Sequence, residues 1–212
     1  MKITVFGATG GIGGHVVEQA LTAGHKVVAV VRESSTYDVR HPSLEVLRVP
    51  GLEEAELLRP ALDGSAAVVS GVGARSRKAG PVASTSTRSI LAAMAAAGVD
   101  RFVAVSAIPL GPVPPDESFL NRRVVLPMIN AFAADVYADL RVMEADIMSS
   151  STEWTIVRPP KLTNKPLTGK YRVSVGDTVP RTYSISRADV AHLMLAAIDD
   201  PAMINQPVSA GY

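Results

Sequence analysis

Cysteine is missing from this chain of 212 residues. Its absence excludes disulfide bonds, thiolate catalysis and cysteine-ligated metal, and it fits a reducing compartment, so we expect a cytoplasmic protein. Long apolar runs are missing too, because none approaches the ~20 residues that a membrane span needs. A strand pattern at residues 3–6 directly follows Met1 and Lys2, and we therefore expect no cleavable signal.

Excess charge of either sign is also absent. The chain has 21 Lys and Arg against 20 Asp and Glu, a net charge of +1, and 47% hydrophobic against 19% charged residues. This balance is typical of a globular protein with a small-molecule ligand, and nothing in it points to nucleic acid. A chain of this length fits one domain that buries roughly 70% of the surface of its unfolded form. We therefore expect a single domain over residues 1–212.

Short apolar runs alternate with helical stretches along the chain. The runs are continuously apolar and rich in β-branched residues, as parallel strands covered on both faces are. Strands are expected at residues 3–6, 26–31, 44–49, 66–70, 101–105 and 154–157, and helices at 12–23, 53–62, 82–97, 135–149 and 186–198. The alternation predicts an α/β fold with a doubly wound, Rossmann-like parallel sheet. The proline-rich stretches 109–127 and 159–180 both follow strands and are expected to be substrate-covering loop insertions.

A glycine-rich motif, Gly-Ala-Thr-Gly-Gly-Ile-Gly at residues 7–13, stands between the first strand and the first helix. In this context Gly7 permits a tight turn, Gly10 lets the backbone approach a pyrophosphate, and Gly13 lets the helix pack closely on the strand. The helix start offers unpaired N–H groups and positive dipole charge to phosphates. The motif predicts a dinucleotide site formed by Gly7, Thr9, Gly10, Gly11, Ile12 and Gly13.

The residue after the second strand distinguishes the two nicotinamide cofactors. NAD-binding proteins carry an acid here for the ribose 2′-hydroxyl, whereas this chain has Arg32, nineteen residues after Gly13. Arginine can clamp a 2′-phosphate, with Ser34 and Ser35 as further donors, so the sequence favours NADP (NADPH) over NAD. A solvated surface arginine is the alternative. Further cofactor contacts are expected in loops at the same sheet edge, from Gly71, Gly73, Arg75 and Pro159.

Several motifs together resemble a known family. They are the glycine motif, Val-Arg-Glu-Ser-Ser at 31–35, Val-Ser-Ala at 105–107, Pro-Pro-Lys-Leu-Thr-Asn-Lys-Pro-Leu-Thr-Gly-Lys-Tyr at 159–171 and Ile-Ser-Arg-Ala-Asp at 185–189. Nearly end to end, the chain resembles the NADPH-dependent flavin reductase, or biliverdin reductase B, family of atypical short-chain dehydrogenase/reductases. The resemblance implies a monomeric enzyme that transfers hydride from NADPH to a flavin, quinone or linear tetrapyrrole.

Three positions depart from the family pattern. Lys161 replaces its histidine after the double proline, Pro50-Gly51 replaces its acid after the third strand, and the second basic residue near the 2′-phosphate is replaced around Tyr37. These departures leave substrate identity open. Two alternatives also remain: a non-catalytic NADP-sensing regulator of the NmrA-like kind, and a tailoring reductase of a biosynthetic pathway.

Two residues are candidates for the chemistry. Ser106 ends the fifth strand, where short-chain reductases carry their serine, and could contact the nicotinamide or a substrate oxygen. Lys161 could donate a proton or hold an anion, and we prefer the second role. The Tyr-x-x-x-Lys pair of those enzymes is absent, because Tyr137 is followed four residues later by Arg141. That argues against chemistry that needs a tyrosinate base.

The loops at the carboxyl ends of the strands are basic, and our hypothesis is that the substrate is anionic. Scattered solvated charges are an equal alternative. These basic residues are Arg75, Arg77, Lys78, Arg122, Arg123, Arg158, Lys161, Lys165 and Lys170. Glu144 lies three residues after Arg141 on an expected helix, and this spacing predicts an intrahelical ion pair. The four histidines have no partner at ligand spacing, so we assign no metal site.

Overall fold

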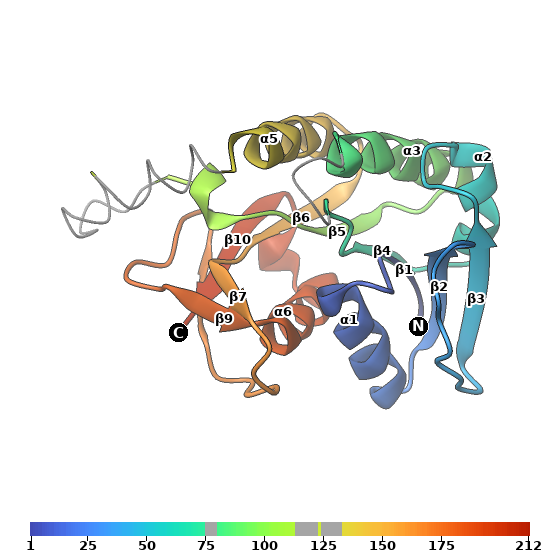
Figure 1. The fold of residues 1–212 in the computed structure, drawn as a ribbon, viewed down its shortest axis with the longest axis horizontal. Helices are drawn as coiled ribbons and strands as arrows, with labels where there is room; N and C mark the ends of the chain where they lie inside the picture. The colour runs from blue at the N-terminus through green and yellow to red at the C-terminus, as the bar shows by residue number, and fades with distance from the viewer. Residues whose placement is uncertain (75–79, 113–122, 124–132) are drawn as a thin grey trace.

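The computed structural model describes residues 1–74, 80–112, 123 and 133–212 (Figure 1). Its main sheet has eight strands in the order β3-β2-β1-β4-β5-β6-β10-β8. The strands are β1 (Lys2–Phe6), β2 (Lys26–Arg32), β3 (Leu44–Val49), β4 (Ala67–Ser70), β5 (Arg101–Val105), β6 (Glu153–Arg158), β8 (Arg172–Val175) and β10 (Gln206–Gly211). A separate pair joins β7 (Lys161–Thr163) to β9 (Ser184–Ser186).

Every neighbouring pair in the main sheet is parallel except β10 with β8. From β1 the chain adds β2 and β3 on one side, and then returns to add β4, β5 and β6 on the other. The expected doubly wound α/β fold is therefore confirmed. The reversal places a switch point between the carboxyl ends of β1 and β4, which is where open α/β sheets bind ligands.

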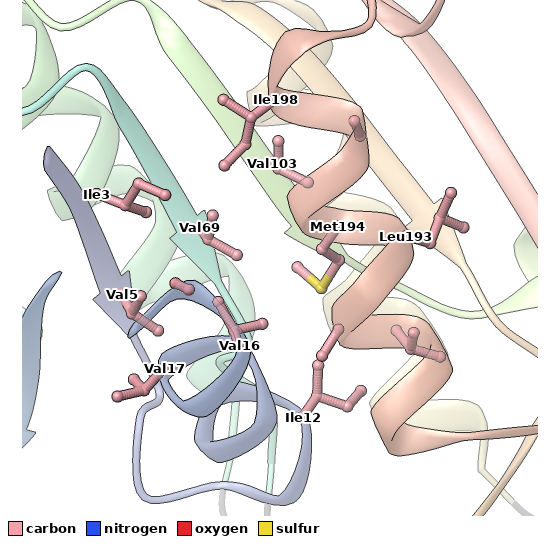
Figure 2. Close-up of a cluster of buried hydrophobic side chains, with 14 of the residues drawn as sticks. Ile3, Val5, Ile12, Val16, Val17, Val69, Val103, Leu193, Met194 and Ile198 are labelled. Carbon is pink, nitrogen blue, oxygen red and sulfur yellow. The ribbon is translucent and has the colours of Figure 1, made fainter. Parts of the chain in front are cut away.

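Helices cover both faces of the sheet (Figure 1). One face carries α1 (Gly11–Thr22) and α6 (Arg187–Asp199), and the other carries α2 (Ala55–Leu58), α3 (Val82–Ala97) and α5 (Ala134–Met148). Figure 2 shows α1 and α6 side by side, with Ile12, Val16 and Met194 packed against Val5 and Val103 of the strands. This packing fixes the N-termini of α1 and α6 close to the switch point.

The helix expected over residues 53–62 is shorter and changes type. After α2 the chain continues as the 3₁₀ helix η1 (Arg59–Leu62). Pro60 explains the change, because it lacks an N–H and its ring clashes with the preceding turn of an α-helix. Two further 3₁₀ turns, η2 (Ile108–Leu110) and η4 (Pro201–Met203), also contain proline.

Side chains from other elements cap the N-terminus of α3 and the C-terminus of α6. Asp139 of α5 accepts hydrogen bonds from the N–H groups of Ala83 and Ser84, at 2.8 and 3.0 Å, at the start of α3. Arg101 of β5 donates to the carbonyls of Ala197 and Ile198 at the end of α6. Burial lowers the pKa of Arg101, and nearby carboxylates, Glu153 among them, oppose this shift. Over the described ranges, no helix has the length and hydropathy of a membrane span.

Candidate functional site

The glycine loop between β1 and α1 is closed by backbone contacts that leave no room for side chains. Gly7 has a φ of +76°, and its carbonyl accepts a hydrogen bond from the Gly10 N–H at 2.8 Å. A Cβ at Gly13 would lie 2.7 Å from the Gly7 carbonyl carbon and closer still to its oxygen. A Cβ at Gly7 would lie 2.8 Å from the backbone of Gly71, which follows β4. The two loops at the switch point are therefore packed backbone against backbone.

The first turn of α1 faces the same place. The helix begins at Gly11, its N-cap residue Gly10 provides no side-chain cap, and its first turn contains no acidic residue. Its first three N–H groups have no intrahelical acceptor. The Ile12 side chain points into the core and is 7% exposed, so only the backbone of this residue can serve a ligand. Uncapped N–H groups with positive dipole charge suit a phosphate.

Arg32 is the last residue of β2 and is exposed, and Ser34 is exposed beside it. Ser35 is half-buried, and its carbonyl accepts a hydrogen bond from Arg48 of β3 at 3.1 Å. Arg48 also donates to the carbonyl of Tyr37 at 3.3 Å. The structure thus brings a second guanidinium to this loop from a neighbouring strand. Its position in the sequence gave no signal of this.

Tyr37 occupies the position where the family pattern has a basic residue. Its ring packs on the core cluster that contains α1, and its hydroxyl is buried without a hydrogen-bond partner in the described part of the chain. Burial raises the pKa of Tyr37. The residue therefore fixes the loop after β2 by packing and brings no charge to it.

Ser106 directly follows β5, and its N–H donates to the carbonyl of Val157 at 2.7 Å. The side chain is 8% exposed, and Oγ has no hydrogen-bond partner within the described residues. Buried hydroxyls without a partner are rare and call for an explanation. In the sheet order only β4 separates β5 from β1, so this hydroxyl lies along the sheet edge from the glycine loop. A ligand that spans the switch point would supply its missing partner.

The structure separates the residues that follow β6. Pro159 is buried, and its carbonyl accepts a hydrogen bond from Ile108 at 3.0 Å. Lys161 begins β7 and is exposed, and Lys165 and Lys170 farther along are exposed as well. These three lysines remain available to an anion.

Arg158 does not belong with these lysines, which corrects our expectation. It is buried at the end of β6 and forms a two-point ion pair with Glu144 of α5, with Nε to Oε1 at 3.0 Å and Nη2 to Oε2 at 2.7 Å. The expected intrahelical pair of Glu144 with Arg141 was also wrong. Burial decides the outcome, because a buried carboxylate needs a buried cation and Arg141 is exposed.

The segment 159–171 is tied to α6 by Asp189. This buried carboxylate accepts hydrogen bonds from the N–H groups of Thr168 and Gly169, from the Thr168 hydroxyl, and from Ser186 and Tyr212. Burial by itself raises the pKa of Asp189, but the hydrogen bonds from Tyr212, Thr168, Gly169 and Ser186 outweigh it and lower the pKa to about 2. The two sequence motifs at residues 159–171 and 185–189 therefore form one structural unit.

Arg187 lies next to this unit. The sequence did not predict a role for it, because the Ile-Ser-Arg-Ala-Asp motif was interpreted only as a helix start capped by Ser186. Ser186 does cap α6, since its hydroxyl accepts from the Asp189 N–H at 2.9 Å. The Arg187 side chain lies across Gly11, where a Cβ would meet its Cδ at 2.6 Å. It also donates to Oδ1 of Asn164 at 2.6 Å.

The other predicted residues divide into two groups. Gly71 packs on the glycine loop, as described, and Gly73 is exposed with open space around its Cα. Arg123 is exposed. Four of the basic residues, Arg75, Arg77, Lys78 and Arg122, lie outside the described residues.

Solved structures share this fold over almost the whole chain. A short-chain dehydrogenase/reductase from Veillonella parvula, solved in complex with NADP, is 18% identical, covers 100% of this chain and 94% of its own, and gives a TM-score of 0.81. The anaerobilin reductase ChuY from Escherichia coli O157:H7 is 21% identical, with 99% and 96% covered and a TM-score of 0.77. These likenesses support the architecture.

Sequence comparisons go further. An uncharacterized chloroplastic protein of Arabidopsis thaliana is 33% identical over 205 residues, which are 93% of this chain and 71% of that protein. The family model described as NAD(P)H-binding matches residues 7–201, from the glycine loop to beyond α6. The predicted class of cofactor, a nicotinamide dinucleotide, is thereby confirmed. This chain belongs to the NAD(P)H-binding family.

Proposed function

We propose that this protein is an NADPH-dependent reductase that transfers hydride to a flavin, a quinone or a linear tetrapyrrole. The observation that carries the proposal is the buried hydroxyl of Ser106, which lies on the same sheet edge as the glycine loop and has no hydrogen-bond partner among the described residues. Membership of the NAD(P)H-binding family implies that the chain binds a nicotinamide dinucleotide, and the fold is shared with an anaerobilin reductase. A hydroxyl buried at this edge can donate a hydrogen bond to the nicotinamide or to a substrate oxygen.

The residues present fit a phosphorylated dinucleotide. Gly7 and Gly13 let the loop after β1 approach a pyrophosphate, and the uncapped N–H groups of α1 would hold it. Arg32 would bind the ribose 2′-phosphate. Arg48, which fixes the carbonyls of Ser35 and Tyr37, keeps the loop in place for this contact and adds positive charge. A structure of the same fold contains NADP.

Bound NADPH supplies the hydride. Ser106 would donate a hydrogen bond to the carboxamide of the nicotinamide or to the acceptor and thereby orient the two rings. Tyr137 is a poor base, because burial raises its pKa and Arg141, not lysine, follows it four residues later. The proton therefore comes from solvent, which suffices for a conjugated acceptor. Lys161 would bind an anionic substituent of the acceptor that lies outside its conjugated ring system.

The test follows NADPH absorbance with purified protein against FMN, riboflavin, a panel of quinones and biliverdin. We expect turnover with at least one acceptor, and a loss of tenfold or more in kcat for Ser106→Ala. Ser149→Ala is the matched control, because Ser149 is exposed at the end of α5 and its hydroxyl bonds only the carbonyl of Asp146. Tight NADPH binding without turnover on any acceptor would overturn the reductase and favour the NADP-sensing regulator.

A further inference from the structure

Arg187 lies where the N-termini of two helices meet. It is the first residue of α6, and its side chain crosses the first residue of α1. A Cβ at Gly11 would meet Cδ of Arg187 at 2.6 Å and Nε at 2.9 Å. Gly11 therefore has a role beyond its backbone, because the absence of a side chain at this position leaves the space that Arg187 fills. Figure 2 shows the two helices packed side by side.

The charge of Arg187 is placed against both helix dipoles. The N-terminus of a helix carries about +0.5 of an elementary charge and disfavours a nearby cation. Here Arg187 is half-buried beside two such ends, and among the described residues its guanidinium donates to the neutral amide oxygen of Asn164 at 2.6 Å. None of the ion pairs within the described ranges includes it. An anion bound between the two helix N-termini would offset their electrostatic repulsion with Arg187.

The same side chain reaches the segment that covers the substrate side. Asn164 follows β7 by one residue and lies three residues after Lys161. Farther along, Thr168 and Gly169 bind the carboxylate of Asp189. The first turn of α6 therefore holds this segment at two points, one by Arg187 and one by Asp189. Only the Arg187 contact adjoins the glycine loop.

We propose that Arg187 binds the pyrophosphate of the dinucleotide and, through Asn164, couples occupancy of the cofactor site to the position of residues 161–171. The inference rests on dinucleotide binding at α1, which is part of the proposed function, and does not require turnover. A dianionic pyrophosphate would be shared by Arg187 and the N–H groups of α1. Arg187, fixed by the ligand, would then fix Asn164 and hold Lys161 over the acceptor.

Binding measurements with three ligands test the first part. For Arg187→Met we expect the affinities for NADP⁺ and NAD⁺ to fall by the same factor, about ten- to a hundredfold, as a lost charge-assisted contact predicts. Adenosine 2′-monophosphate, which lacks the pyrophosphate, should bind Arg187→Met as it binds the wild type. Arg32→Ala should give the opposite pattern, with weaker binding of NADP⁺ and adenosine 2′-monophosphate and unchanged binding of NAD⁺.

Controls keep the two proposals apart. Arg59→Met removes an exposed arginine of η1 and should change no affinity. Arg187→Lys keeps the charge and should recover part of the lost affinity, which a purely structural role would not predict. Unchanged NADP⁺ and NAD⁺ affinity in a folded Arg187→Met protein would overturn this inference alone. A wild type that binds neither dinucleotide would overturn the proposed function as well.

Limited trypsin digestion tests the coupling, because Lys161 and Lys170 are exposed cleavage sites in the segment. We expect NADP⁺ to slow cleavage at these sites several-fold in the wild type. In Asn164→Ala, the protein should still bind NADP⁺ but lose most of this protection. Cleavage after Arg141, an exposed residue of α5, is the internal reference. Equal protection in the variant and the wild type would overturn the link through Asn164.

Discussion

Asp189 accepts hydrogen bonds from both the N–H and the hydroxyl of Thr168, each at 2.9 Å. The first contact goes to one carboxylate oxygen and the second to the other, so Thr168 spans the whole group. Since Asp189 is 0% exposed, all of its lone pairs must be satisfied within the protein. The loop at residues 168–169 therefore depends on the ionised form of this residue.

Stability should depend on the ionisation of Asp189. Its pKa falls from 3.8 to about 2 in the folded protein. A lowered folded pKa contributes stability that is fully present above the unfolded pKa and is lost as the pH falls towards 2. The shift corresponds to about 2 kcal/mol. We expect Asp189→Asn to lower the free energy of unfolding in urea at pH 7, and the difference from wild type to shrink between pH 4 and pH 2.

The matched control is Asp38→Asn, because Asp38 is exposed in the loop after β2. It should change the stability by less than about 0.5 kcal/mol at either pH. A constant difference between wild type and Asp189→Asn across this pH range would contradict the assignment.

The buried pair of Glu144 and Arg158 gives a second stability prediction. Glu144→Gln leaves a buried guanidinium without its countercharge and should cost about 3–5 kcal/mol of unfolding free energy. The double variant Glu144→Leu/Arg158→Met removes both charges and should be more stable than Glu144→Gln. Thermal and urea denaturation of the three proteins provide the measurement. If Glu144→Gln and the double variant were equally stable, the unpaired charge of Arg158 would not be the cause of the lost stability.

Two adjacent glycines of α1 form a matched pair. A Cβ at Gly13 would press on the Gly7 carbonyl, whereas one at Gly14 would lie 3.6 Å from the carbonyl oxygen of Ala8, an ordinary contact. Gly13→Ala should cost about 1–3 kcal/mol through overpacking and displace the loop that holds the pyrophosphate. Gly14→Ala should leave stability unchanged or raise it by up to about 1 kcal/mol.

Melting temperature and NADPH affinity, measured on both glycine variants, test this pair. A Gly13→Ala protein with native stability and affinity would show that the loop relaxes freely.

Cofactor preference should depend on Arg32. Its exposed side chain at the end of β2 is expected to bind the 2′-phosphate through charge-assisted hydrogen bonds of about 1.5–3 kcal/mol. Arg32→Ala should therefore raise KM for NADPH about ten- to a hundredfold and change KM for NADH little. Arg40→Ala, an exposed arginine of the following loop, is the control. Equal effects of Arg32→Ala on both cofactors would contradict the assignment.

Acceptor charge can be tested at the three exposed lysines after β6. If Lys161 holds an anion, Lys161→Met should raise KM for FMN several-fold more than KM for riboflavin, and high salt should reduce the difference in the wild type. Lys26→Met, at the opposite end of the sheet, is the control. Absence of any preference for FMN in the wild type would leave the lysines without a substrate role.

The sequence was sufficient for the glycine loop and for β1 to β6, six of the seven parallel strands of the main sheet, because buried parallel strands form continuous apolar runs. It was not sufficient for β10, whose residues Gln206–Gly211 include proline, serine and glycine. This strand is specified by its place between β6 and β8, which is a tertiary effect. Strands β7 and β8 lie within residues 159–180, which were expected to be a loop insertion, and β9, the partner of β7, was not predicted.

For the site residues, too, the sequence predicted local features but not tertiary contacts. Positions at strand ends could be predicted, since parallel strands bring their carboxyl ends to one edge. The partners of Arg158 and the approach of Arg187 to Gly11 could not, because each joins residues far apart in the chain. Periodicity carries no information on such pairs. The error over Glu144 arose in this way: local helix spacing suggested Arg141, and burial selected Arg158.

The place of β10 has a consequence for how the protein is made. During synthesis, β6 leaves the ribosome before β10, and β8 emerges with no neighbour in the sheet until residues 206–211 follow. Until then the sheet ends at β6 with an open row of backbone groups, a surface that invites pairing with other chains. The nascent protein therefore carries an additional unpaired strand edge, which favours aggregation, until β10 has emerged and paired with β6.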